Sequence, residues 1–430
     1  MNNILLKDYL IEITKGTTPT TIGGEFIESG VNFVKAECLN TGRIIDKSSL
    51  SYISPEIHKK LNRSILQEDD LLFSIAGHLG KMAIVRKEDL PANTNQAVAI
   101  LRIDQKKGDV NFLYYYLNST QISNYIRKQC AQSVQPNLNL AQVGQLPIIV
   151  YSLPTQKSIA KVLSDLDAKI ELNNKINREL EAMAKTLYDY WFVQFDFPTP
   201  PSSTSGIVGK PYKSSGGKMV YNAELKREIP EGWEVKNLFK SCIVQYGFPF
   251  STEYFNSEEN GVPVIRIRDI LDNTISNYST EKKLDEKYLI KKGDLLIGMD
   301  GNFHINYWSK NECYLNQRVV KLSETILPNI ILKYQIEPYI KLREKSVSRT
   351  TVGHLSDKDL KALNLFIPSK EVLASVSPLF NKTLNRIIQT QNENQQLSSL
   401  RDWLLPMLMN GQVASRASAT GESRASATEE

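Results

Sequence analysis

Apolar residues recur every three or four positions across residues 153–197, which is the spacing of one face of a long α-helix. Asn173, Asn174 and Asn177 interrupt this stripe at its midpoint, where polar residues can fix the register of a coiled coil at some cost in stability. About 40 residues at 1.5 Å each make a helix on the order of 60 Å long. Such a helix needs a partner to cover its apolar face. The stripe consists of Ile159, Leu163, Leu166, Ile170, Ile176, Leu180, Met183, Leu187 and Tyr190.

A second stripe with the same spacing covers residues 372–409 and again has a polar centre, at 391–396. Pro378 and Pro406 favour a bend near its ends. Taken alone, either stripe is equally consistent with an ordinary amphipathic helix. Two long helices at matching places in two halves of the chain favour a pair instead. Because each helix follows a globular segment of similar size, we expect the pair to be antiparallel.

The rest of the chain divides into two α+β segments. Residues 1–152 contain short β-rich runs between turn residues and a helix or helix pair at 111–128. Residues 198–217 are rich in Pro, Ser, Thr and Gly, as linkers are. The predicted order is a first domain at 1–152, a central long helix at 153–197, a linker at 198–217, a second domain at 218–368, and a C-terminal long helix at 369–413.

The second domain repeats the first in outline. Short similar runs occur in the same order in both, and the loosest match is the last one. Their common order indicates an internal duplication. The predicted fold is therefore α+β, with two similar α/β domains separated by a long antiparallel two-helix coiled coil in a pseudo-two-fold internal repeat. The matched runs are 30–35 with 261–266, 68–72 with 292–296, 95–98 with 316–319, and 136–138 with 353–355.

Composition places the chain among globular proteins, with 41% hydrophobic and 23% charged residues. A net charge of +5 permits nucleic-acid binding without requiring it. The four cysteines (Cys38, Cys130, Cys242 and Cys313) are widely spaced and accompany only four histidines, so neither structural zinc nor a disulfide framework is favoured. No signal peptide or membrane span is predicted, and we expect a cytoplasmic location.

The sequence lacks most of the motifs that would indicate a catalytic site. There is no glycine-rich dinucleotide fingerprint, no phosphate loop and no motif of an amino-methylating enzyme. Asp70 and Asp294 are possible catalytic carboxylates, but each opens a β-rich run after a turn, which is a sufficient structural explanation. We therefore expect a chain that catalyses nothing and holds no metal or cofactor.

Two similar domains with a helical spacer suit a molecule that reads two separated sites on double-stranded DNA. Lys and Arg near phosphates would supply affinity, and polar side chains reaching base edges would supply specificity. For any single residue a solvated or turn role is the more ordinary explanation, so the hypothesis rests on their collective placement. The candidates are Lys35, Arg43, Asn93, Asn95, Gln96, Gln135 and Asn137 in the first domain, and Arg266, Arg268, Asn316, Gln317, Arg318, Ser348, Arg349 and Thr350 in the second.

Several longer motifs carry a family resemblance. They are Asp70-Leu71-Leu72, Asn95-Gln96, the approach to the first helix at 146–156, the aromatic run at 187–198, the second-domain entry at 217–233, and the final run at 401–411. With these motifs the chain resembles the specificity subunit of type I restriction-modification systems, over residues 1 to about 413. The resemblance implies two target-recognition domains, each reading one half of a bipartite DNA sequence.

The resemblance also implies partners. The long helices would dock modification (methyltransferase) subunits, with two expected, which carry S-adenosylmethionine and methylate adenine. Restriction subunits would add ATP- and Mg-dependent translocation and cleavage. Recognition loops vary in this family, so no base-contacting residue can be transferred. Candidate residues for docking or for the spacer are Leu180, Met183, Leu187, Tyr190, Trp191, Leu397, Leu400 and Leu404.

An alternative function is a non-catalytic coiled-coil adaptor that joins protein partners without reading DNA. Sequence-specific binding to duplex DNA would distinguish the two. Residues 414–430 depart from the family pattern, because a six-residue run beginning at Ser415 recurs at Ser423 and contains no apolar stripe. We expect this tail to be disordered.

Overall fold

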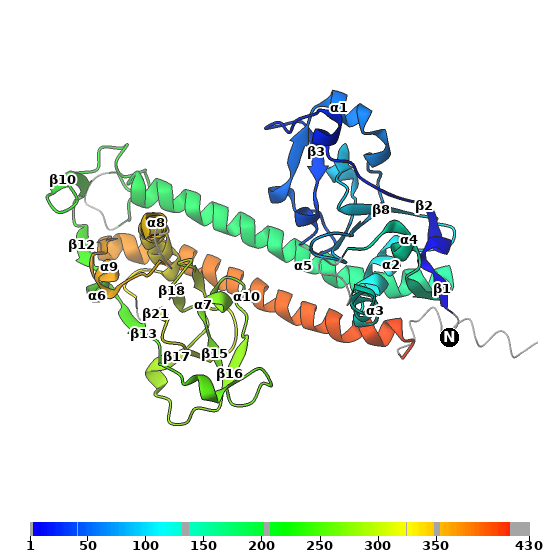
Figure 1. Cartoon of the computed structure of the whole chain (residues 1–430). Coiled ribbons are helices and arrows are strands. Elements are labelled where there is room, and N and C mark those ends of the chain that lie inside the picture. Colours follow the sequence, from blue (N-terminus) through cyan, green and yellow to red (C-terminus); the bar gives the residue numbers. More distant parts are fainter. Residues whose placement is uncertain are drawn as a thin grey trace, which may run out of the picture. The chain divides into compact units, whose positions relative to one another are not determined.

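The computed structural model describes residues 3–40, 42–130, 137–201, 207–323, 325–347 and 353–412. The chain forms two compact units: unit 1 comprises Met1–Lys169 and Leu397–Glu430, and unit 2 comprises Ile170–Gln396. Two long helices, α5 (Leu153–Tyr188, green in Figure 1) and α10 (Lys370–Met409, orange to red), each contribute to both units. A π-helical turn, Asp189–Val193, continues α5.

Unit 1 contains a four-stranded antiparallel sheet in the order β2-β8-β5-β6 and a smaller sheet in the order β4-β3-β7. Neighbouring side chains of β5 point to opposite faces. Leu71 and Phe73 therefore pack with α2 and α5, whereas Leu72 packs toward the smaller sheet. The strands are β1 Asn3–Leu5, β2 Leu10–Lys15, β3 Val31–Val34, β4 Ser51–Ile53, β5 Leu71–Ser74, β6 Met82–Ile84, β7 Ala92–Thr94, β8 Val98–Ile103 and β9 Pro147–Ile149; the short helices are α1 Pro55–Lys60, α2 Val110–Leu117, α3 Thr120–Cys130 and α4 Leu140–Gly144.

Unit 2 repeats this construction with added strands. Its four-stranded sheet has the order β13-β21-β18-β19, and its second sheet has the order β14-β16-β15-β20-β17. In β18, Leu295 and Ile297 pack with α8 and α10, whereas Leu296 packs toward the second sheet. The same alternation occurs in β5. The strands are β10 Met219–Asn222, β11 Arg227–Pro230, β12 Glu234–Asn237, β13 Ile243–Tyr246, β14 Phe255–Asn256, β15 Val262–Ile265, β16 Asn277–Ser279, β17 Leu289–Ile290, β18 Leu295–Gly298, β19 Ile305–Tyr307, β20 Cys313–Leu315, β21 Val319–Ser323 and β22 Asn364–Ile367; the helices are α6 Leu238–Ser241, α7 Ile267–Ile270, α8 Asn329–Val347 and α9 Asp357–Lys361.

The predicted internal duplication is confirmed by strand pairing. Strand β3 pairs antiparallel with β4 and parallel with β7, and β15 pairs antiparallel with β16 and parallel with β20. Each unit also has a strand before its long helix that pairs antiparallel with an early strand, β1 with β9 and β12 with β22. The region expected to hold a helix or helix pair is a pair, α2 and α3.

The long helices run antiparallel within each unit. In unit 2, Asn173 Nδ2 donates to Asn394 Oδ1 (2.9 Å), and Thr390 Oγ1 donates to Asn177 Oδ1, so rising numbers on α5 meet falling numbers on α10. In unit 1, Asp167 accepts from Arg401, and Tyr151 donates to the Met409 carbonyl. The expected antiparallel helix pair is therefore confirmed within both units.

The buried face of α5 matches the apolar stripe only in part: Ile159 and Leu163 are buried as predicted, but two stripe residues near its C-terminal end are not. Met183 and Tyr190 are 43% and 40% exposed, although the stripe placed them on the covered face. The buried face instead includes polar Asp167, Asn173 and Asn177, and small Ala184. These polar side chains are buried because they form hydrogen bonds, which hydrophobic periodicity does not reveal.

The described part of the predicted linker is packed rather than extended. Phe197 stacks on Tyr212, with ring centroids 4.7 Å apart, and on Trp233 at 5.3 Å. Thr199 is buried, and its amide donates to the Lys210 carbonyl (3.0 Å). Residues 198–201 and 207–217 thus belong to unit 2. The aromatic cluster of Phe197, Tyr212 and Trp233 holds this segment in place. The predicted tail, 414–430, lies outside the described residues.

Candidate nucleic-acid interface

Parallel strands bring two distant loops together in each unit. In unit 1, Val34 at the end of β3 pairs with Thr94 at the end of β7, so Lys35 and Asn95 follow side by side. In unit 2, Ile265 pairs with Leu315, which places Arg266 next to Asn316. The carboxyl ends of parallel strands meet at one edge of a sheet, where loops commonly carry function.

In each unit, a third loop passes close to the carboxyl ends of these parallel strands. The Thr17 amide donates to the Thr94 carbonyl (3.1 Å), and the Phe248 amide donates to the Leu315 carbonyl (2.8 Å). A Cβ on Gly16 would lie 2.0 Å from the Thr94 oxygen, and one on Gly247 would lie 1.9 Å from the Asn316 oxygen. Both positions thus require glycine, because any side chain would collide with backbone.

A fourth pair of segments completes the arrangement. The Leu138 amide donates to Ile75 (2.9 Å), and the Leu355 amide donates to Met299 (2.7 Å). Ile75 and Met299 in turn donate to the carbonyls of Ala97 and Arg318. We call the joined segments the loop face of each unit. In unit 1 it comprises 16–18, 35, 75–77, 95–97 and 137–138; in unit 2 it comprises 247–248, 266–268, 299–301, 316–318 and 353–355.

Several predicted DNA-contacting residues lie on these loop faces. Gln96 and Asn137 are exposed in unit 1, and Arg268, Gln317 and Arg318 are exposed in unit 2. The Gln96 side chain accepts from Thr18, which links two of the converging loops. Asn95 is half-buried, and its side chain accepts from the Ala97 amide (3.1 Å), so it shapes the turn that presents Gln96.

Lys35 and Arg266 occupy equivalent positions and are partly covered. Lys35 Nζ lies 4.6 Å from the Phe26 ring centroid and 3.9 Å from Glu37. Arg266 Nη2 donates to Ser276 Oγ (2.7 Å). Burial lowers the pKa of the Arg266 guanidinium, and the neighbouring charge of Arg268 lowers it further. Both cations are therefore held in place by their own unit.

Three candidates need correction. Asn93 is fully buried, contacts His58 and donates to the Leu61 carbonyl (3.1 Å), so it is a core residue. Asn316 is only 8% exposed, so little of its side chain is accessible to DNA. The Arg43 carbonyl accepts from Ile84, which pairs with the first residue of β5, and Arg43 Nη1 donates to Asn111 (3.1 Å). Arg43 therefore lies at the opposite end of β5 from the loop face.

Other candidates cannot be placed, and two residues were missed. Gln135, Ser348, Arg349 and Thr350 lie outside the described residues. Asp300 and His354 belong to the loop face of unit 2 but were not among the candidates. The loose match between 136–138 and 353–355 was the available signal for His354. Nothing in the sequence pattern pointed to Asp300, because its position depends on the pairing of distant segments.

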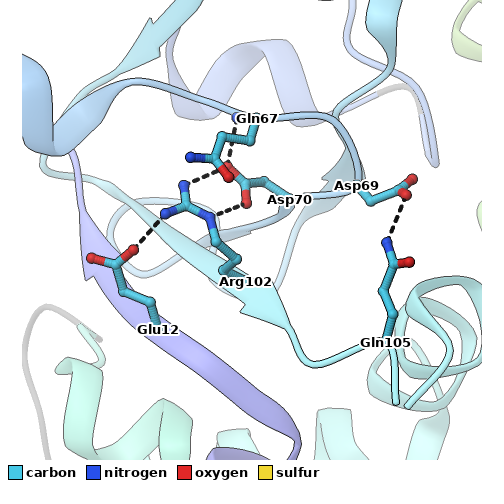
Figure 2. A network of polar contacts seen from close by, with 6 residues as sticks. All are labelled: Glu12, Gln67, Asp69, Asp70, Arg102 and Gln105. Atoms are coloured by element: carbon cyan, nitrogen blue, oxygen red, sulfur yellow. Dashed lines mark hydrogen bonds and ion pairs between the residues drawn. The ribbon is translucent and has the colours of Figure 1, made fainter. Parts of the chain in front are cut away.

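Asp70 and Asp294 have structural roles. Asp70 is 1% exposed, accepts from the Gln67 amide (2.8 Å) and forms two hydrogen bonds with Arg102, at 2.9 and 3.0 Å. Figure 2 shows this network extending through Arg102 to Glu12. Asp294 accepts from the Lys291 amide (2.8 Å) in the equivalent turn. Burial raises the pKa of both carboxyls.

The helices expose apolar residues on which a partner protein can pack. Met183, Tyr190 and Leu400 are 40–43% exposed. Leu180, Leu187 and Trp191 are half-buried against the core of unit 2, and Leu404 against that of unit 1, so these four mainly hold the helices in place. Leu397 is also half-buried. On the two long helices, the most exposed apolar residues are Leu172 and Trp403, at 52% and 58%, and neither was among the candidates.

Two features are absent from the described residues. No group of three or more His, Cys, Asp or Glu side chains in the described ranges is arranged to hold a metal ion. Within the same ranges, no helix has the length and apolar character needed to cross a membrane. Cys38, Cys242 and Cys313 are buried free thiols.

Comparison with known proteins gives a consistent result. The chain is 25% identical over 418 residues to the MjaIX specificity subunit, a type I restriction enzyme component of Methanocaldococcus jannaschii, covering 94% of this chain and 91% of that one. It is 24% identical over 378 residues to the HindI specificity subunit of Haemophilus influenzae, covering 70% and 77%. The crystal structure of a type I S subunit from M. genitalium has the same fold, with a TM-score of 0.56, 15% identity and 95% coverage of both chains.

The family model described as the type I restriction modification DNA specificity domain matches twice. The matches cover residues 6–182 and 230–397, so each includes one loop face and the greater part of one long helix. The chain belongs to the family of type I restriction-modification DNA specificity proteins.

Proposed function

We propose that the chain is the DNA-recognition subunit of a type I restriction-modification complex, and that each unit reads one half of a bipartite sequence in double-stranded DNA. One observation carries this proposal: the two loop faces share one backbone construction but carry different side chains. A common backbone suits a common task, the presentation of polar groups to base edges. The different side chains would give the two half-sites different sequences.

The proposed partners follow from the exposed apolar residues of the long helices. Modification subunits, with two expected, would pack on positions such as Met183, Tyr190, Leu400 and Trp403. These subunits would bind S-adenosylmethionine and methylate adenine, and restriction subunits would use ATP and Mg. In this division the chain recognises DNA and catalyses nothing itself. Such a complex acts on DNA in the cytoplasm.

Methylation assays with and without the partner test this division of labour. The purified chain alone should neither bind S-adenosylmethionine nor methylate DNA, whereas the chain assembled with its modification subunit should methylate adenines within one bipartite sequence. Methylated positions in treated genomic DNA would be mapped by sequencing. Methyl transfer by the rigorously purified chain would contradict the division. An assembled complex that binds DNA without sequence preference would favour the adaptor function instead.

A further inference from the structure

Three polar side chains meet on the loop face of unit 2. Asp300 lies two residues after β18, Arg318 immediately precedes β21, and His354 immediately precedes the buried Leu355. Asp300 Oδ2 lies 3.2 Å from Arg318 Nε, and Asp300 Oδ1 lies 2.6 Å from His354 Nδ1. We call these three residues the Asp–Arg–His cluster. The carboxylate at its centre contacts both of the other side chains.

The backbone turns this cluster outward. Met299 and Leu355 are buried in the core of unit 2, and side chains alternate between faces along an extended segment. Asp300 and His354 therefore point away from the core. Arg318 precedes the fully buried Val319 and also points outward. The side chains of Arg318, His354 and Asp300 are 55%, 46% and 29% exposed.

Unit 1 lacks this cluster at the equivalent positions. The amides of Ile75 and Met299 donate to the carbonyls of Ala97 and Arg318, which makes Ala97 the counterpart of Arg318 and Ala76 the counterpart of Asp300. The matching hydrogen bonds of Leu138 and Leu355 make Asn137 the counterpart of His354. The two loop faces thus differ in chemistry where their backbones correspond.

A contribution to the stability of the fold does not by itself explain the Asp–Arg–His cluster. Ion pairs between exposed side chains typically contribute about 0–1 kcal/mol, because water screens them. The ion pair with Asp300 does, however, restrict where the Arg318 guanidinium can lie on the loop face. The Arg318 side chain is 55% exposed, and among the described residues only Asp300 forms an ion pair with it. Two parallel Nη–H donors match the O6 and N7 acceptors of guanine in the major groove.

We propose that Arg318 reads a guanine in the half-site of unit 2, with Asp300 as the residue that positions its guanidinium and His354 as a second side chain holding Asp300. The inference rests on the proposed function, since it requires that this loop face meets DNA. A carboxylate close to DNA phosphates is unfavourable unless a cation neutralises it. Asp300 is paired with the Arg318 guanidinium, so its presence on the loop face is compatible with this role. Unit 1, with Ala76 and Ala97, would have no such requirement for guanine.

Methylation mapping of the assembled complex tests the proposal. Arg318→Lys keeps the positive charge but loses the planar two-donor edge. It should lower discrimination for guanine at one position of one half-site by roughly 5- to 150-fold and leave the other half unchanged. Asp300→Asn should relax the same position to a smaller extent. Adding Asp300→Asn to Arg318→Lys should have little further effect, because the two residues act together.

Lys341→Ala is the matched control. Lys341 is an exposed cation of unit 2 on α8, paired with Glu337 (3.2 Å) and outside the loop face. It should leave every base preference unchanged. The proposal is overturned if the wild-type sequence has no guanine sensitive to Arg318→Lys, or if that variant lowers methylation equally for all sequences. Both results differ from a failure of the proposed function, in which the wild-type complex would methylate no bipartite sequence.

Discussion

At the scale of single residues, burial separates structural polar groups from those available to DNA. Asn93, Asp70 and Asp167 are all less than 10% exposed, and each forms hydrogen bonds within its own unit. Gln96, Gln317 and Arg318 are exposed at turns whose backbone is fixed by neighbouring loops. Residue type alone does not distinguish the two groups, since both contain amides and charged side chains.

The buried thiols provide a residue-scale prediction. Burial raises the pKa of Cys38, of Cys313 and of Cys242, the last to about 12, so folding suppresses the ionisation of these thiols. In the unfolded chain they ionise near pH 8.5. In a Cys130→Ser variant, alkylation at pH 9 should therefore be slow until urea unfolds the chain. Rapid alkylation of the native variant would contradict the burial of these residues.

The raised pKa values of these thiols also determine how the stability of the folded chain changes with pH. A group with a raised pKa in the folded state binds its proton more tightly there, so its contribution to stability is complete below the unfolded value and is lost as pH rises toward the folded value. For Cys242, stability should decline between about pH 8.5 and about pH 12. Cys242→Ser, whose hydroxyl does not ionise in this range, should reduce that decline.

At the scale of elements, periodicity predicted the long helices and most of the apolar residues on their buried faces, but not the polar residues there. The short β-rich runs predicted within residues 1–152 correspond to strands such as β3, β5 and β8, since apolar runs between turns mark buried strands. The buried face of α5 includes Asp167, Asn173 and Asn177, which have no apolar signal. The loop faces were only partly predicted, because parallel pairing joins residues about 50–60 positions apart.

One buried carboxylate links α5 to α10 in unit 1. Asp167 accepts from Tyr115 and from Arg401 Nη1 (2.7 Å), and Arg401 also contacts Asp402 (2.8 Å). Arg401→Ala should lower the free energy of unfolding of unit 1 by about 1–3 kcal/mol, because it leaves a buried charge without its cation. Thermal unfolding followed by circular dichroism would measure the loss.

Arg386→Ala is the control for this variant. Arg386 is also on α10, but it is exposed, and among the described residues its guanidinium donates only to Gln389 on the same helix (3.3 Å). The expected loss of stability is within about 0.5 kcal/mol. Equal losses for the two variants would mean that the Asp167 contact contributes little to the packing of α10.

At the scale of the whole molecule, duplication gives one chain two recognition modules. The shared strand order and the two close approaches of glycine to backbone preserve the construction of each loop face. The exposed side chains differ, as the Asp–Arg–His cluster and its counterparts Ala76, Ala97 and Asn137 illustrate. A change in one loop face should therefore alter one half of the target and leave the other half intact.

Mapping methylated adenines for two loop-face variants tests this independence most directly. Gln96→Ala with Asn137→Ala alters unit 1, and Gln317→Ala with Arg268→Ala alters unit 2; all four side chains are exposed, so both variants should fold. Each variant, assembled with the modification subunit, should change the base preferences of a different half-site and leave the remaining half as in the wild type. If both variants altered the same half, or if either altered both halves, the two units would not be independent readers of DNA.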